Sequence, residues 1–112
     1  MKKETTLFID TSDSSQTTVA LIIDGIRKEY IEVTNKETKS QNILPLIEKA
    51  LQSEELTFKD LTDIKVHPGP GSFTGVRVGV SVANVLGWSL KIPVNGKRME
   101  LPIYEASKFD IL

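Results

Sequence analysis

A glycine- and proline-rich segment, His67-Pro68-Gly69-Pro70-Gly71-Ser72-Phe73-Thr74-Gly75, has the composition of a loop that could bind an anion. Glycines let a backbone approach a ligand closely, and the first N–H groups of a helix attract negative charge. Gly71, Ser72 and Thr74 are therefore candidate anion-binding residues. The alternative is a tight strand-to-helix turn, in which Ser72 or Thr74 caps the helix and Gly75 permits close packing. The residues alone leave both interpretations open.

The spacing of the loop glycines bears on nucleotide binding. Gly69, Gly71 and Gly75 form the pattern G-x-G-x-x-x-G. This pattern matches neither the phosphate loop G-x-x-x-x-G-K-[ST] nor the dinucleotide-binding motif G-x-G-x-x-G. The sequence therefore gives no support for nucleotide binding through either motif.

A second polar cluster, Asp10-Thr11-Ser12, directly follows the apolar run Leu7-Phe8-Ile9. A carboxylate and hydroxyl groups at the carboxyl end of a strand could hold a metal-bound phosphate, which makes Asp10 and Ser12 candidate anion-binding residues. The alternative is a local turn in which these side chains bind neighbouring backbone groups.

Several kinds of chemistry are excluded by composition. The chain has one histidine, His67, and no cysteine, so it contains no His-His or Cys-His metal motif and no thiol nucleophile. No serine is accompanied by the base and oxyanion groups of a hydrolase. The formal net charge of −1 supplies no broad cationic face for a nucleic-acid backbone. We therefore expect no catalytic residue, no metal-binding residue and no tight nucleic-acid binding by this chain alone.

The elements that position these residues alternate between strands and helices. Asp24-Gly25, between two β-rich runs, is typical of a hairpin. Apolar residues from Ile43 to Leu51 recur at helical spacing and predict an amphipathic helix over residues 42–52, which either begins near Asn42 or begins earlier and bends at Pro45. The predicted strands cover residues 7–9, 17–23, 26–33, 63–66 and 92–94.

The segment 74–90 has conflicting patterns. Val76, Val78, Val80 and Val82 alternate as in a strand, whereas small residues fall four apart at Gly75, Gly79, Ala83 and Gly87. Those small residues form one continuous stripe only in a helix, and glycines would serve no purpose in a strand. The pattern therefore predicts a helix whose stripe permits close packing against a neighbour.

The run His67 to Val80, H-P-G-P-G-S-F-T-G-V-R-V-G-V, resembles the signature G-x-G-P-G-S-[FY]-T-G-[LV]-R-[IV]-G of the TsaB family, also called YeaZ. Phe8-Ile9-Asp10-Thr11-Ser12 resembles the opening strand of that family and its D-T-[SA] turn. Ile43-Leu44-Pro45-Leu46-Ile47 and Ile92-Pro93-Val94 resemble two further family segments, so the resemblance covers residues 7–96.

This resemblance implies an α/β fold of the actin-like, ribonuclease H-like class, consistent with the five-stranded mixed sheet and two main helices predicted above from the residue pattern. It also implies a non-catalytic subunit that binds and supports TsaD, the enzyme that transfers a threonylcarbamoyl group to adenosine in tRNA, with TsaE as a possible further partner. ATP and a metal ion are then expected in TsaD and no cofactor in this chain, and tRNA would be contacted only through the complex. A small phosphate- or nucleotide-binding protein acting alone is the alternative.

The resemblance also predicts domain organisation and location. Typical family members have a second, similar domain, so we expect one actin-like domain at 1–96, followed by a tail at 97–112 that resembles the end of full-length members. The tail hints that the second domain was lost internally. We expect a cytoplasmic protein without membrane association, because no apolar run is long enough to span a bilayer.

We expect the two helices to form the surface that docks on TsaD, or that pairs two copies of the chain when TsaD is absent. The stripe would allow close helix packing there or against the chain's own sheet, and the sequence does not choose between the two. The candidate interface residues are Ile43, Ile47, Gly75, Arg77, Gly79, Val80, Ala83, Leu86 and Gly87.

Overall fold

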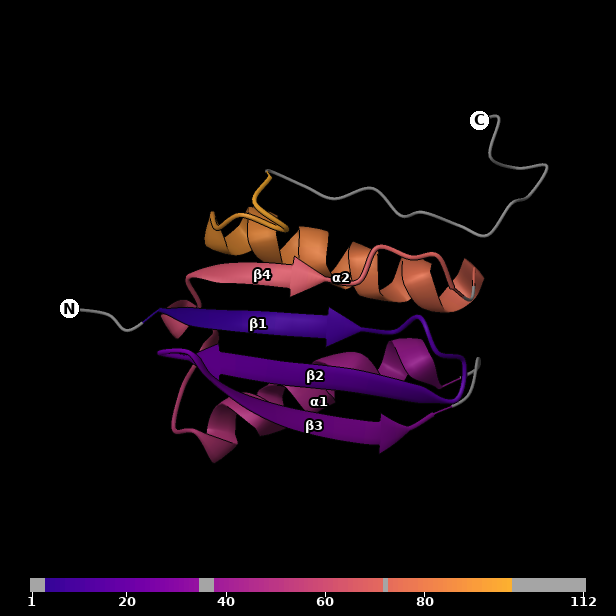
Figure 1. The fold of residues 1–112 in the computed structure, drawn as a ribbon, viewed down its shortest axis with the longest axis horizontal. Helices are drawn as coiled ribbons and strands as arrows, with labels where there is room; N and C mark the ends of the chain where they lie inside the picture. Colours follow the sequence, from indigo (N-terminus) through magenta and orange to yellow (C-terminus); the bar gives the residue numbers. More distant parts are fainter. Residues whose placement is uncertain (1–3, 35–37, 72, 98–112) are drawn as a thin grey trace.

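Four strands form a mixed sheet in the order β3-β2-β1-β4 (Figure 1). They are β1 (Thr5–Asp10), β2 (Gln16–Ile23), β3 (Ile26–Val33) and β4 (Asp63–Val66). The computed structural model describes residues 4–34, 38–71 and 73–97. The first three strands form an antiparallel meander, and β4 pairs in parallel with β1. The predicted α/β class with a mixed sheet is confirmed.

The hairpin between β2 and β3 turns at Asp24 and Gly25, as the sequence predicted. Their φ angles are 54° and 83°, respectively. Two consecutive positive φ angles define the type I′ turn, whose twist matches that of the flanking strands. The turn sets the register in which Ile23 lies opposite Ile26 and Thr18 opposite Ile31.

Both main helices, α1 (Lys39–Ser53) and α2 (Phe73–Leu90), lie behind the sheet in Figure 1, on one of its faces. A short 3-10 helix, η1 (Phe58–Asp60), precedes β4. Helix α1 begins three residues before Asn42 and contains Pro45 in its interior, so the earlier of the two predicted starts is the observed one. The helical prediction for 74–90 is confirmed, despite the strand-like alternation of its valines.

The core lies between the sheet and the two helices. Every second residue of β1 faces it, and Leu7 and Ile9 are fully buried there. From the helices, α1 contributes Ile43, Ile47 and Leu51, while α2 contributes Val76, Val80 and Ala83. The far end of α1 is also tied to the sheet edge, because Glu54 accepts hydrogen bonds from Lys28 Nζ at 3.0 Å and Tyr30 Oη at 3.3 Å.

The prediction of a fifth strand at Ile92-Pro93-Val94 is wrong. Val94 makes isolated bridges, a parallel one to Ile64 of β4 and an antiparallel one to Lys97, so the described part of the sheet has four strands. Ile64 N donates to Pro93 O at 3.0 Å and Asn95 N donates to Ile64 O at 2.8 Å. Pro93 has no N–H to extend the ladder, and positive φ angles at Asn95 (52°) and Gly96 (75°) turn the chain away.

Residues 98–112 lie outside the described residues, so the predicted division into a domain at 1–96 and a tail at 97–112 stays a prediction. Among the residues that the structure covers, no helix has both the length and the apolar character needed to cross a bilayer.

Candidate functional site

Helix α2 lies unusually close to the end of β1, and the contact is made through Gly79. A Cβ added to Gly79 would overlap with Thr11 Oγ1 and would lie 3.4 Å from Thr11 Cβ. Thr11 is fully buried, and its hydroxyl donates a hydrogen bond to the carbonyl oxygen of Gly75, one turn earlier in α2. The loop after β1 and the first half of α2 are therefore held together by a close contact and a buried hydrogen bond.

Further along α2, Gly87 has the same role. A Cβ at Gly87 would overlap with Val94 Cγ2 and would lie 3.1 Å from Ile92 O. Ala83, between the two glycines, is fully buried. Of the two alternatives that the sequence left open, the structure therefore shows the stripe packed against the chain's own fold.

Because of this placement, most of the interface residues that we expected from the sequence are not at the surface of the chain. Seven of its nine residues are buried within the chain: Ile43, Ile47, Gly75, Gly79, Val80, Ala83 and Gly87. Periodicity shows which residues share a helix side but not which neighbour that side meets, and here the neighbour is the sheet. Leu86 is half-buried against the core, and Arg77 is exposed.

The opposite side of α2 is the one that a partner could reach. We call it the outer face of α2; it consists of Thr74, Arg77, Val78, Ser81, Val82, Val85 and Trp88. Trp88 is 82% exposed and Val85 is 62% exposed. These residues recur every three or four positions, so they share one side of the helix. Arg77 is the only charged residue of the helix, and Val78 and Val82 are half-buried against the core, so Val85 and Trp88 supply most of the exposed apolar surface of this face.

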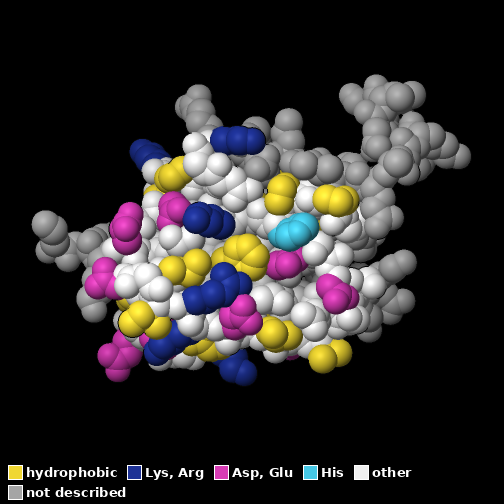
Figure 2. All heavy atoms as spheres, viewed as in Figure 1, with side chains coloured by type: hydrophobic (Ala, Val, Ile, Leu, Met, Phe, Trp, Pro, Cys, Tyr) yellow, Lys and Arg dark blue, Asp and Glu magenta, His cyan; other side chains and the backbone are white. Residues whose placement is uncertain are grey.

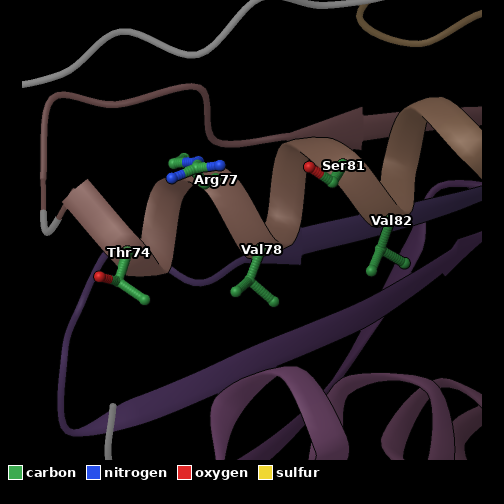
Figure 3. A pocket seen from close by; sticks show the side chains of 5 residues that line it. All are labelled: Thr74, Arg77, Val78, Ser81 and Val82. Carbon is green, nitrogen blue, oxygen red and sulfur yellow. The ribbon is translucent and has the colours of Figure 1, made fainter. Parts of the chain in front are cut away.

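A hollow runs along the first half of the outer face (Figure 3). It is lined by Thr74, Arg77, Val78, Ser81 and Val82. In Figure 3, Thr74, Val78 and Val82 point to one side of α2, and the side chains of Arg77 and Ser81 lie apart from them. Of the residues on this face, only Arg77 and Thr74 were predicted as site residues from the sequence. The large residues opposite the glycine stripe, above all Val85 and Trp88, were the signal that could have found the rest.

The second candidate site is at the ends of β1 and β4. Asp10 Oδ1 accepts hydrogen bonds from Ser12 N at 2.9 Å and from Ser12 Oγ at 2.6 Å. This arrangement is the local turn that we considered as the alternative to ligand binding. Gly71 meets the same turn, because a Cβ added to it would lie 2.7 Å from Ser12 Cβ. The structure thus brings Asp10, Ser12 and Gly71 together.

The other predicted anion-binding residues do not complete this cluster in the described part of the chain. Thr74 is exposed and lines the hollow on the outer face of α2. Ser72 lies outside the described residues. His67 Nδ1 accepts a hydrogen bond from Gly69 N at 3.1 Å, which shapes the loop. Within the described ranges, no three His, Cys, Asp or Glu side chains are grouped so that they could hold a metal ion.

Known proteins resemble this chain in sequence. The family model of the tRNA N6-adenosine threonylcarbamoyltransferase TsaD matches residues 12–97. The tRNA threonylcarbamoyladenosine biosynthesis protein TsaB of Bacillus subtilis is 40% identical over 91 residues, which cover 81% of this chain and 39% of the relative. The TsaB protein of Escherichia coli is 34% identical over 90 residues, which cover 80% of this chain and 38% of the relative.

A solved structure resembles the chain in fold. YeaZ from Pseudomonas aeruginosa superposes with a TM-score of 0.75 at 29% sequence identity, over 91% of this chain and 45% of that chain. The chain thus spans less than half the length of these relatives. Because the family model covers most of the chain and the TsaB and YeaZ proteins agree with it in sequence and fold, the chain belongs to the TsaB (YeaZ) family.

Proposed function

We propose that this chain is a non-catalytic subunit of the complex that synthesises N6-threonylcarbamoyladenosine in tRNA, where it binds and supports the catalytic subunit TsaD. Family membership supports the pathway, since the relatives are named for biosynthesis of this nucleoside. The observation that carries the proposal is the outer face of α2, an exposed and largely apolar surface next to the signature loop. The proposed place of action is the cytoplasm.

The composition of the outer face suits a protein partner. Apolar residues exposed together on a surface commonly mark protein–protein contacts, and tryptophan and arginine are enriched among the residues that dominate binding energy. Arg77 lies in the first half of this face and Trp88 at its C-terminal end, with Val78, Val82 and Val85 between them. In the proposed complex, Trp88 fills a pocket of TsaD and Arg77 faces an acidic group at the rim.

Several features favour a role in assisting TsaD over a catalytic role for this chain. The sequence has a single histidine and no cysteine, and the only His contact described is within the loop. In the proposed division of labour, TsaD holds ATP and the metal ion, and TsaE is a further partner. Transfer RNA reaches this chain only through the complex, because a net charge of −1 offers little attraction to phosphates.

The test is co-purification. TsaD from the same source is tagged, and the amount of this chain that is recovered with it is compared between the natural chain and two variants. Val85→Lys places a charge in the exposed apolar part of the outer face, beside Trp88, and should abolish co-purification, because an unpaired charge in an apolar contact is strongly unfavourable. Val33→Lys is the matched control, since Val33 is 84% exposed on the far edge of the sheet. Equal recovery of both variants would exclude the outer face as the docking surface.

In the absence of TsaD, we propose that the same face pairs two copies of the chain, because a two-fold contact covers one apolar patch with another. Sedimentation equilibrium measures this directly. The natural chain should show a concentration-dependent dimer that Val85→Lys converts to a monomer, and a dimer that persists in the variant would place the contact elsewhere.

A second candidate function is a small phosphate- or nucleotide-binding protein that acts alone. The observation in its favour is the meeting of Asp10, Ser12 and Gly71 at the ends of neighbouring strands. Asp10 Oδ1, however, already accepts two hydrogen bonds from Ser12, as expected for a structural turn. Calorimetric titration of the isolated chain with ATP and magnesium decides the matter, because saturable binding that Asp10→Asn removes would favour this candidate.

A further inference from the structure

The sheet has one face that no described element covers. Both helices pack on the other face (Figure 1). The residues that alternate with the core residues along each strand therefore belong to the face opposite the helices. We call this surface the open face; Figure 2 looks onto it. By the strand register and alternation, it consists of Thr6, Phe8, Asp10, Gln16, Thr18, Ala20, Ile22, Arg27, Glu29, Ile31, Val33, Asp63 and Lys65.

The open face is partly apolar. Ala20 is fully buried, and the guanidinium of Arg27 lies over the Phe8 ring at 4.7 Å from its centroid. Beyond this covered centre, Ile31 remains 55% exposed and Val33 84% exposed. All-parallel sheets usually have both faces covered, whereas antiparallel sheets can leave one face to water; in this mixed sheet, the exposed apolar side chains of Ile31 and Val33 favour a cover. No described element supplies that cover.

The chain itself supplies a segment of suitable composition. Residues 98–112, which lie outside the described residues, contain seven large apolar residues: Met99, Leu101, Ile103, Tyr104, Phe109, Ile111 and Leu112. Leu101 and Ile103 are two apart, as are Phe109 and Ile111, so each pair would place both apolar side chains on one side of an extended backbone.

The point at which this segment leaves the described fold also fits. Val94 bridges to Ile64 of β4 and to Lys97, so the chain departs beside the β4 edge of the sheet. From there to β3 is three strand spacings, or about 14 Å. Residues 98–112 reach up to about 50 Å when extended, which is ample to cross the sheet. A covalently attached segment also has an effective concentration far above that of a separate partner.

We propose that residues 98–112 dock across the open face of the sheet and place their apolar side chains over Phe8, Ile22 and Ile31. The segment thereby acts as the second covering layer of the domain, on the face opposite the two helices. This inference does not depend on the proposed function, because it concerns a different surface from the outer face of α2.

Thiol labelling tests the proposal cleanly, because the chain has no cysteine of its own. Ile31→Cys places one thiol on the open face, and its labelling rate is measured in two backgrounds. One has the natural segment, and the other carries Ile103→Ser, Phe109→Ser and Ile111→Ser. Labelling should be at least about tenfold slower with the natural segment, which is the protection expected when the docked state is favoured by about 1.4 kcal/mol.

Ser81→Cys is the matched control, because Ser81 is exposed on the outer face of α2. Its labelling rate should be the same in both backgrounds. If Ile31→Cys impairs folding, Val33→Cys reports on the same face. Equal rates for the open-face thiol in both backgrounds would overturn the proposal, as would a change at Ser81→Cys instead. Protection that grows with protein concentration would identify a second copy as the cover and would also overturn it.

Discussion

The contact between Gly79 and Thr11 leads to a prediction whose sign depends on how α2 sits on the sheet. In an exposed helix, Gly→Ala stabilises by about 1 kcal/mol, because glycine is a poor helix former. At Gly79, however, the added Cβ would come well within 3.0 Å of Thr11 Oγ1, a separation that real Cβ atoms do not show. Gly79→Ala should therefore destabilise the protein.

The magnitude follows from three terms. Overpacking a buried site costs about 1–3 kcal/mol. Moving Thr11 away from Gly75 O weakens a buried hydrogen bond worth about 1 kcal/mol. The gain in helix propensity offsets about 1 kcal/mol of this sum. The net expectation is a loss of about 2 kcal/mol, or a fall in Tm of roughly 8 °C for a chain of this size.

Urea and thermal unfolding followed by circular dichroism measure this loss. Ser81→Ala on the exposed side of the same helix is the control and should change stability by less than about 0.5 kcal/mol. In the double variant with Thr11→Ala, most of the effect of Gly79→Ala should disappear, because the overlapping atom is gone. If the Gly79→Ala protein is as stable as the natural one, or more stable, then α2 does not pack against Thr11 as closely as the structure shows.

Three further predictions concern other parts of the fold. Gly25→Ala should cost about 1 kcal/mol in chemical unfolding, because Gly25 has φ 83° even though no atom lies within 4 Å of an added Cβ. Asn95→Ala should cost about 1–3 kcal/mol, because its side chain accepts from Val66 N at 2.8 Å and donates to Val66 O at 2.9 Å. The hydrogen bond and the negative charge of Glu54 raise the pKa of Lys28. The stability that this pair adds is therefore present below the ordinary pKa of lysine and is lost as the pH rises through the raised pKa. NMR titration of Lys28 should show a lower pKa in Glu54→Gln than in the natural chain.

The strands and helices of this fold could largely be predicted from the sequence, because their signals are local. Asp24-Gly25 defined the hairpin, and the four-residue spacing of Gly75, Gly79 and Ala83 identified α2 as a helix against the alternation of its valines. The fifth strand failed because an apolar triplet cannot show that the turn after it, at Asn95 and Gly96, ends the pairing.

The site was predicted less well, because it depends on which surfaces meet. The glycine stripe correctly indicated a close approach, but the partner in that approach is Thr11, which is 68 positions earlier than Gly79 in the chain. Because the glycine stripe is buried against the sheet, Val85 and Trp88 lie on the exposed side of α2. Neither residue was predicted as a site residue from the sequence. The cluster of Asp10, Ser12 and Gly71 was predicted from residue types, and the structure brings these three residues together through local turn contacts.

The central claim is that the outer face of α2 binds TsaD, and the affinity of a Trp88→Ala variant tests it most directly. Trp88 is 82% exposed, so its removal should leave the stability of the isolated chain nearly unchanged. Isothermal titration against TsaD should show an affinity at least about 30-fold weaker than that of the natural chain, which is a loss of about 2 kcal/mol for an anchoring tryptophan. An unchanged affinity in Trp88→Ala, with TsaD still bound tightly, would contradict the account.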